Sequence, residues 1–228
     1  MKKAFLFGLA AMLMSCNLLA GPETQNRTVD NFTGIDAREG IKVNVVQGSA
    51  ESVKVTANTE YISELITEVE NGTLVIRWTG KVNFKKRSAT VDVVATDLNR
   101  IVASSGASVK TDTIKADKLA LASSSGAKLE ISSVSASKID LNASSGASIV
   151  VEGTAQRAAL DASSGARIKG PNLTVGEATA SASSGASVSV TVTDKFSADA
   201  TSGGSIRYGG KPQFSDANAS SGGSISKL

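Results

Sequence analysis

A Ser-Ser-Gly turn recurs about every twenty residues through the second half of this chain, and no other feature constrains the fold as strongly. The seven copies, of which the sixth begins with Thr201 instead of serine, are spaced by 20, 20, 19, 20, 18 and 19 residues and end at Gly106, Gly126, Gly146, Gly165, Gly185, Gly203 and Gly222. A period this steady is typical of a solenoid, in which each repeat forms one rung and the stacked rungs enclose a shared core. The sequence therefore predicts an elongated repeat architecture.

Apolar residues flank each turn at fixed positions. An aliphatic residue lies three positions after every turn glycine, from Val109 to Ile225, and an aliphatic residue or alanine lies five positions before it, from Ile101 to Ala217. Apolar residues at alternate positions mark strands with one face turned inward. Each rung therefore carries one strand before the turn and one after it. Because crossovers between parallel strands are strongly right-handed, we expect an all-β, right-handed parallel β-helix with rungs of about 20 residues.

The turns themselves have a predicted backbone conformation. Their glycines are expected to adopt a positive φ, which glycine tolerates without steric cost. A serine precedes the glycine in every copy, and stacked rungs would place these hydroxyls in ladders about 4.8 Å apart. We expect the hydroxyls to hydrogen-bond along the stack and to turn amides. The alternative is a flat polar face that contacts sugar or another surface.

A second column of side chains, four residues before the turn glycine, is predicted to face outward. Such a column could bind carbohydrate hydroxyls or a cation, or it could be a solvated face, because adjacent acids repel one another without a bound cation. We take it as the candidate surface-binding site, and we expect no metal there. Its members are Asn142, Asp161, Ser181, Asp199 and Asn218.

The N-terminus carries an export signal. Lys2 and Lys3 precede an apolar run over residues 4–14 that is too short to span a bilayer. Leu-Met-Ser-Cys at residues 13–16 resembles the bacterial lipobox, which implies lipidation of Cys16. We therefore predict a lipoprotein signal peptide over residues 1–15 and a tether over residues 16–30. The alternative is cleavage after Ala20, which would release the protein without a lipid.

The segment between the tether and the repeat, residues 31–98, is predicted to form an N-terminal β-rich cap that includes a first rung. Residues 35–41 follow the repeat pattern without its serines, and Asn71-Gly72 between apolar runs is a strong hairpin signal. A basic loop surrounds Phe84 at residues 81–87; we interpret it as a solvated hairpin loop, with contact to an anionic glycan as the alternative. The repeat itself is predicted over residues 99–228.

Catalytic chemistry is not apparent in the sequence. The chain has no histidine and one cysteine, which excludes a Ser-His-Asp triad and a Cys-based zinc cluster. Asp140 and Asp161 fall at different places in their rungs, whereas a retaining glycosidase needs two carboxyls about 5 Å apart. Two Ser-x-x-Lys matches, which end at Lys128 and Lys138, are expected by chance in a serine-rich chain. We therefore predict a protein that is not an enzyme and uses no cofactor.

Several motifs together resemble a known family. They are Phe-Thr-Gly-Ile at residues 32–35, Val-Asn-Val-Val-Gln-Gly at 43–48, the hairpin at 71–76, Asp-Leu-Asn-Arg-Ile at 97–101 and the Ser-Gly repeats. In this arrangement the chain resembles the auto-transporter adhesin head GIN domain family, which is common in Bacteroidetes. The resemblance covers residues from about 31 to the C-terminus. It implies an exported β-helical protein, and the family offers no catalytic residues to carry over.

The function predicted from the sequence is that of a non-enzymatic, lipid-anchored cell-envelope protein, an adhesin or a glycan- or surface-binding module. We expect an outer-membrane lipoprotein that faces either the periplasm or the exterior. The expected partners are the membrane, through the lipid, and a glycan or another surface protein; export argues against nucleic acid. Two alternatives stay open: a structural module that self-associates into a homo-oligomer, and a β-helix enzyme that cleaves polysaccharides.

Overall fold

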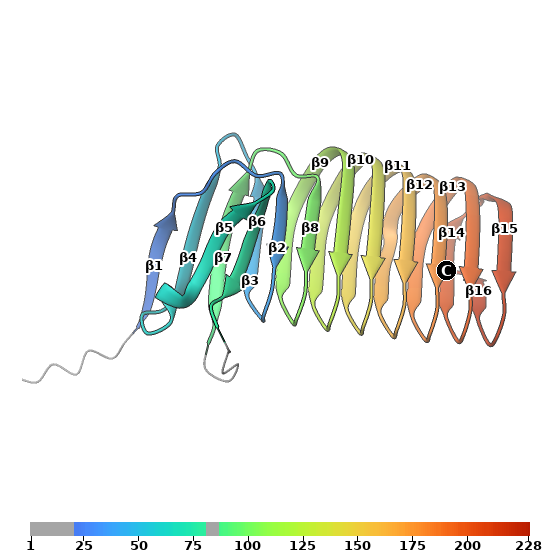
Figure 1. Ribbon diagram of the computed structural model, residues 1–228. Coiled ribbons are helices and arrows are strands. Elements are labelled where there is room, and N and C mark those ends of the chain that lie inside the picture. The colour runs from blue at the N-terminus through green and yellow to red at the C-terminus, as the bar shows by residue number, and fades with distance from the viewer. Residues whose placement is uncertain (1–20, 81–86) are drawn as a thin grey trace, which may run out of the picture.

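A computed structural model describes residues 21–80 and 87–228 of the chain. Its strands form one continuous 16-stranded sheet that winds into a β-solenoid of about six turns. Figure 1 shows an elongated molecule with a more irregular cap at the N-terminal end and evenly stacked rungs toward the C-terminus. The predicted all-β solenoid is confirmed.

The middle rungs of the repeat consist of strands of 14–16 residues that each run from one turn to the next, and shorter strands lie at both ends. Neighbouring strands are parallel and in register, so that Leu129 lies beside Ile149 and Leu141 beside Leu160. The strands are β8 (Arg100–Ala103), β9 (Ser108–Ser123), β10 (Lys128–Ala143), β11 (Ser148–Ala162), β12 (Arg167–Ala182), β13 (Ser187–Ala200), β14 (Ser205–Gly210), β15 (Gln213–Ala219) and β16 (Ser224–Lys227).

The core is built from the predicted inward columns. The aliphatic residues three positions after each glycine are buried from Val109 through Ile206, and so are the residues five positions before it through Ala198. This second column shrinks from leucine to alanine along the stack. Phe196 on β13 compensates for the loss of volume, because it is fully buried beside Ala178 of β12. The interior thus stays filled although the repeat is not uniform.

Each Ser-Ser-Gly turn has a positive φ at two residues rather than one. The turn glycines adopt φ values of 71 to 76°, as predicted, but the serines before them also lie in the left-handed region, at 49 to 53°. Adjacent turns are joined by peptide groups, since each glycine N–H donates to a serine carbonyl of the next turn at 3.0–3.1 Å. No side-chain hydrogen bond joins the turn serines in the described part of the chain. The expectation that stacked hydroxyls hydrogen-bond to one another is therefore wrong. Backbone hydrogen bonds join the stacked turns instead.

A first rung without serines opens the solenoid. Strands β2 (Gly34–Ala37) and β3 (Lys42–Gln47) run parallel to β8 and β9, respectively. Glu39 and Gly40 take the place of the serine and glycine, with φ values of 61 and 74°. The Gly40 N–H donates to the Ser105 carbonyl at 3.0 Å, which continues the turn ladder. The predicted opening rung is thus present.

The cap lies on the outer side of this first rung. Strands β6 (Thr73–Trp78) and β7 (Ala89–Ala95) extend the stack parallel to β2 and β3. Strands β4 (Ser52–Asn58) and β5 (Leu65–Glu70) then pair antiparallel with β7 and β6, and the short 3-10 helix η1 (Ile62–Glu64) joins them. The β5–β6 connection is the predicted hairpin, with Asn71 and Gly72 both at positive φ. The antiparallel strands close this end of the core.

The predicted tether over residues 16–30 is wrong for part of its length. Pro22–Arg27 forms strand β1, which pairs antiparallel with the outer edge of β4. Its side chains alternate between exposed and half-buried, and Arg27 donates to the Ile62 carbonyl at 2.9 Å. Hydrogen bonds between backbones hold this strand, so its sequence needs no apolar alternation. A polar edge strand of this kind also protects the sheet from pairing with another chain.

Candidate functional site

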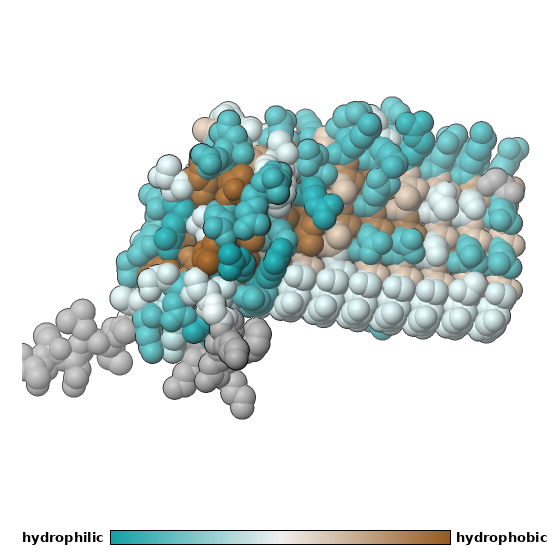
Figure 2. All heavy atoms as spheres, viewed as in Figure 1, coloured by the Kyte–Doolittle hydropathy of each residue, from teal (hydrophilic) through white to brown (hydrophobic). Residues whose placement is uncertain are grey.

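The polar column predicted from the sequence is continuous in the structure. The register places Asn142 beside Asp161, Asp161 beside Ser181, Ser181 beside Asp199 and Asp199 beside Asn218, one residue per rung. Parallel neighbours of this kind lie about 4.8 Å apart. Asn218 donates from Nδ2 to Oδ1 of Asp199 at 3.2 Å. In Figure 2 a largely hydrophilic row runs along the solenoid, above the pale edge formed by the turns.

Charge within this column is diluted. Ser181 separates Asp161 from Asp199, so the two carboxylates lie two rungs apart. The repulsion that would call for a bound cation is therefore weak. Within residues 21–80 and 87–228, no group of three cysteine, aspartate or glutamate side chains has the arrangement of a metal site. The column suits hydrogen bonding better than ion coordination.

A second outward column, six residues before the turn glycine, forms a floor beside the first. It contains several small side chains, and the register continues from rung to rung. A hollow of about 300 Å³ lies where Ala120 and Ala159 leave space between longer neighbours. Its polar lining includes Arg100, Asp140, Asn142 and Asp161. The floor column consists of Arg100, Ala120, Asp140, Ala159, Thr179 and Ser197.

A third column, eight residues before the glycine, is mainly basic, and sequence reasoning missed it. A second hollow of about 300 Å³ lies between it and the floor, and both hollows are lined by Ala159 and Thr179. Extending the repeat alignment four residues beyond the predicted polar column would have found it. Its members are Lys118, Lys138, Arg157, Glu177 and Lys195.

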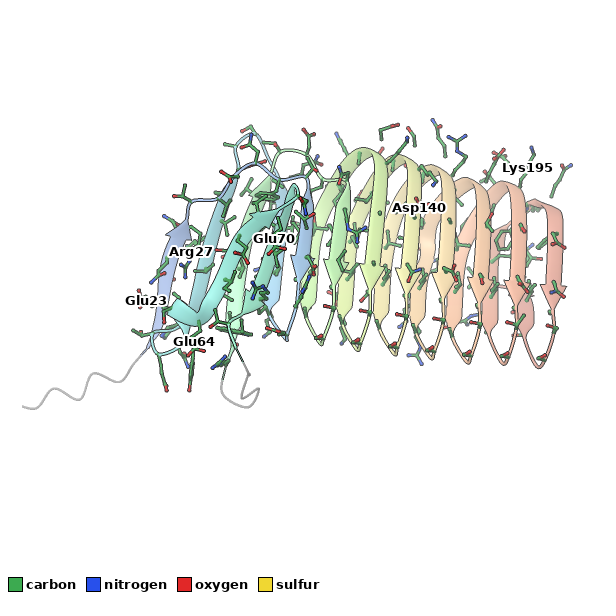
Figure 3. The ribbon with its side chains drawn as sticks, viewed as in Figure 1. Glu23, Arg27, Glu64, Glu70, Asp140 and Lys195 are labelled. Atoms are coloured by element: carbon green, nitrogen blue, oxygen red, sulfur yellow. The ribbon has the colours of Figure 1, made fainter. Side chains whose placement is uncertain are left out.

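These three columns and the two hollows together are called the groove face below. Figure 3 labels Asp140 of the floor on the strands that face the viewer, and Lys195 of the basic column near the upper edge of the solenoid. Two of its cations are paired, since Lys138 Nζ lies 2.9 Å from Asp140 and Lys195 Nζ lies 3.7 Å from Glu177. Arg157, between them, forms no ion pair among the described residues. The groove face thus offers amides, hydroxyls and carboxylates on one side and cations on the other.

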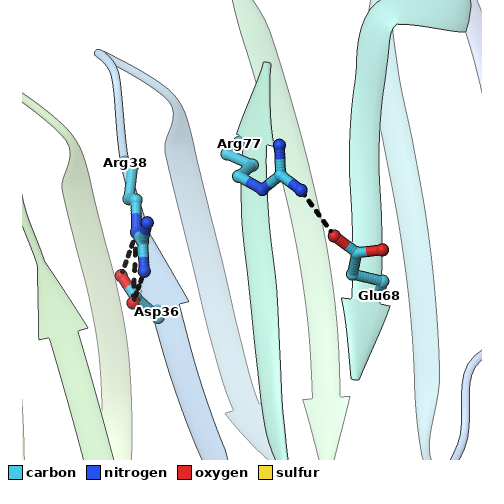
Figure 4. Close-up of polar contacts among 4 residues, drawn as sticks. All are labelled: Asp36, Arg38, Glu68 and Arg77. Carbon is cyan, nitrogen blue, oxygen red and sulfur yellow. Dashed lines mark hydrogen bonds and ion pairs between the residues drawn. The ribbon is translucent and has the colours of Figure 1, made fainter. Parts of the chain in front are cut away.

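The end of the groove face near the cap carries charges that neutralise each other. Figure 4 shows Arg38 bonded to Asp36 and Arg77 bonded to Glu68, at 2.6 and 2.8 Å. The hydrogen bond from Arg38 to the Asp36 carboxylate, and then the charge of that carboxylate, raise the pKa of Arg38 above its ordinary value. Exposed ion pairs of this kind contribute little to stability, at most about 1 kcal/mol each. Further along the solenoid, Arg100, Lys118 and Asp161 form no ion pair among the described residues.

Comparison with known proteins agrees with this architecture. Residues 31–212 match the family described as "Putative auto-transporter adhesin, head GIN domain". The chain belongs to this family. The resemblance predicted from the sequence motifs is therefore confirmed. The sequence matches none of the curated proteins.

Solved structures share the head GIN fold. A "putative adhesin" from Bacteroides fragilis is 23% identical, with a TM-score of 0.83 over 91% of this chain and 97% of that one. A "putative adhesin" from Parabacteroides merdae is 21% identical, with a TM-score of 0.75 over 91% and 96% of the two chains. A "putative lipid binding protein" from Parabacteroides distasonis is 19% identical, with a TM-score of 0.67 over 92% and 98%. At these identities the similarity establishes the fold.

Asp140 and Asp161 meet at the groove face of this head GIN domain, although the sequence suggested that the acids are scattered. Both line the first hollow, on consecutive rungs. Asp140 is bonded to the Lys138 ammonium group and Asp161 is exposed. Both carboxylates line this hollow, where they can accept hydrogen bonds from a ligand.

The remaining predicted sites fall outside this face. Cys16 and residues 81–86 of the basic loop lie outside the described residues. Arg87, at the end of that loop, pairs with Glu64 and stacks over Tyr61 and Trp78, with 5.4 and 5.8 Å to the ring centroids. It therefore stabilises the cap. In the described ranges there is no helix with the length and apolar character needed to cross a membrane.

Proposed function

We propose that this head GIN protein is a non-enzymatic adhesin of the cell envelope that binds glycan chains along its groove face. The observation that supports this is the pair of hollows that share Ala159 and Thr179, between a row of hydrogen-bonding side chains and a row of cations. Amide, carboxylate and guanidinium groups can each bond the hydroxyls of sugars. The family description as an adhesin is consistent with such a role.

The repeat favours an extended ligand over a compact one. From eight residues before the glycine to the turn, the register between β9 and β13 is unbroken. Polar groups therefore recur at one-rung intervals, and successive groups can contact successive units of a polymer. The small floor residues Ala120 and Ala159 let a chain lie close to the sheet. Individual contacts of this kind are weak, so affinity would come from their number.

We further propose that a lipid on Cys16 anchors the protein in the outer membrane. Only residues 17–21 separate Cys16 from β1, and they span at most about 20 Å. Since β1 is the outermost strand of the cap, the cap would lie near the membrane and the groove face would extend away from it. Intact-mass analysis and membrane fractionation of the native protein, beside Cys16→Ala, test the anchor. A soluble form that begins near Gly21 would contradict it.

The binding proposal is tested by removing polar groups from the first hollow. Asn142→Ala combined with Asp161→Ala should weaken binding to a responsive glycan about tenfold or more, because each lost hydrogen bond contributes about 0.5–1.5 kcal/mol. Asn172→Ala combined with Asp112→Ala is a matched control, since it removes the same side chains from exposed positions outside the groove face. The measurement is a glycan array followed by titration of the strongest ligand.

Three results would overturn the proposal. Equal binding by the groove variant and the wild-type protein would separate glycan recognition from the groove face. Shortened glycan products that disappear with Asp140→Asn or Asp161→Asn would identify an enzyme instead. An array without signal, together with normal attachment of cells that lack the protein, would also exclude an adhesin.

A further inference from the structure

A third hollow, with a different chemistry, lies on the strands that leave the turns. Its volume is about 370 Å³, and its polar lining consists of three cations and two serines. The register places Arg167 beside Ser187, and it places Ser189 between Lys169 and Arg207. The three cations thus come from β12 and β14, with the serines of β13 between them. None of these residues lines the groove face.

The cations of this hollow have no counter-charge. Lys169 has Val150 and Ser189 as its register neighbours, and Arg207 has Ser189 and Ser226. Arg167 likewise lies between two serines, Ser148 and Ser187. Among the described residues, none of the three cations forms an ion pair or a side-chain hydrogen bond. They therefore repel one another without local compensation.

Pairing elsewhere on the same face makes the difference clear. Lys110 occupies the same column as Lys169, three rungs earlier, and its Nζ lies 2.7 Å from Glu130 of the next rung. At Lys110 the neighbouring rung thus carries an acidic partner in this column. At Lys169 and Arg207 the neighbouring rung carries Ser189 instead. An anion bound in the hollow would take the place of the missing carboxylate.

The geometry points to a tetrahedral oxyanion, a sulfate or phosphate group, as the ligand of this hollow. Lys169 and Arg207 lie two rungs apart, about 9–10 Å between backbones, so both side chains can close on one anion above Ser189. Ser189 is 7% exposed and forms a low floor, and its hydroxyl makes only a long bond of 3.5 Å to the Ile168 carbonyl. The half-buried Ser187 has no side-chain hydrogen bond within the described residues, so its hydroxyl is available as a donor.

The side chains match the chemistry of such a group. Guanidinium groups bind phosphate and sulfate oxygens with two parallel hydrogen bonds, and lysine adds a compact charge. Serine hydroxyls complete the set of donors. The anion is either free in solution or an ester carried on a glycan chain, and both present the same oxygens to the hollow. This site is independent of the proposed groove function.

Variants that replace the cations with the neutral, polar side chain of glutamine test the site. Lys169→Gln combined with Arg207→Gln should weaken the binding of inorganic sulfate, inorganic phosphate and a sulfated oligosaccharide about tenfold or more in calorimetric titrations. Lys42→Gln combined with Lys128→Gln removes the same net charge from exposed positions on the same side of the rungs, outside the hollow, and should change binding less than twofold. Both pairs are exposed, and thermal unfolding checks that each variant is folded.

The ligands also distinguish the source of the anion. Tighter binding of the sulfated oligosaccharide than of its desulfated form and of inorganic sulfate would assign an ester on a glycan. Equal binding of inorganic sulfate and the oligosaccharide would assign a free-anion site. Equal weakening by both variant pairs, or no saturable binding of any of the three, would overturn the proposal. Asn142→Ala with Asp161→Ala should leave sulfate binding unchanged, which separates this site from the groove face.

Discussion

The turn edge of the solenoid and the opposite edge differ in how they accommodate rungs of unequal length. At the turn edge, all seven copies have nearly the same backbone, with serine φ values of 49 to 53° and glycine values of 71 to 76°. At the opposite edge the register shifts between Ile131 and Val134 and between Val150 and Gly153, and it shifts again in β12. The differences in rung length, 18 to 20 residues, are absorbed there.

This difference shows how a solenoid whose rungs vary in length can still present side chains at a regular spacing on one surface. From β9 to β13, one edge repeats strictly because the other takes up the insertions and deletions. The groove face directly precedes the regular edge, so its columns stay aligned across β9 to β13. Ligand-binding groups at a constant spacing are therefore expected beside the turns and not at the opposite edge.

The two edges also use glycine for different reasons. Gly146 at the turn edge has a φ of 71°, and a Cβ atom added there would meet nothing within 4 Å. Gly153 at the opposite edge has a φ of 122°, and a Cβ atom there would lie 2.2 Å from the Val134 carbonyl oxygen of the neighbouring rung. Gly146 is needed only because the backbone has a positive φ. Gly153 is needed both because φ is positive and because there is no room for a side chain.

Gly153→Ala should therefore have the largest effect. Backbone strain at such a φ costs about 1–3 kcal/mol, and forcing a methyl group against a backbone carbonyl adds a similar amount. We expect the free energy of unfolding to fall by about 3–5 kcal/mol in denaturant titrations. Gly146→Ala is the matched control and should cost clearly less. Equal losses in the two variants would mean that the opposite edge relaxes as easily as the turn edge.

Gly146→Val should have an intermediate effect. A β-branched residue is strained at positive φ, but the surrounding space is open, so only the strain of about 1–3 kcal/mol applies. Thermal unfolding measured beside the wild-type protein tests this. An unchanged melting temperature would mean that the turn conformation contributes nothing to the stability of the stack.

The features that sequence reasoning predicted are those that repeat or depend on a few neighbouring residues. The turn glycines, the inward columns and the Asn71-Gly72 hairpin belong to this class, and so does the first rung, which keeps the spacing without the serines. Strand β1 was missed because backbone pairing to β4 positions it and its side chains are polar. No local pattern distinguishes such a strand from a linker.

The candidate sites were harder to predict because they depend on neighbours about twenty residues apart. The polar column was found because its members share one offset from the glycine. The meeting of Asp140 and Asp161 was missed because the two residues have different offsets and become neighbours only across a rung. The hollow around Ser189 spans rungs of unequal length, so its three cations converge only once the register is known.

The turn serines give the smallest predicted effect and the sharpest test of what the turn edge needs. Ser145 has a φ of 53°, and its hydroxyl makes no hydrogen bond within the described residues, whereas its carbonyl accepts from the Gly126 N–H at 3.1 Å. Ser145→Ala keeps that backbone hydrogen bond and should change the free energy of unfolding by less than about 0.5 kcal/mol. A loss above about 1 kcal/mol would mean that the hydroxyls, and not the peptide ladder alone, hold the turns together. Ser145→Val, which adds β-branching at the same φ, should cost more than Ser145→Ala and thereby separates the effect of conformation from that of the hydroxyl.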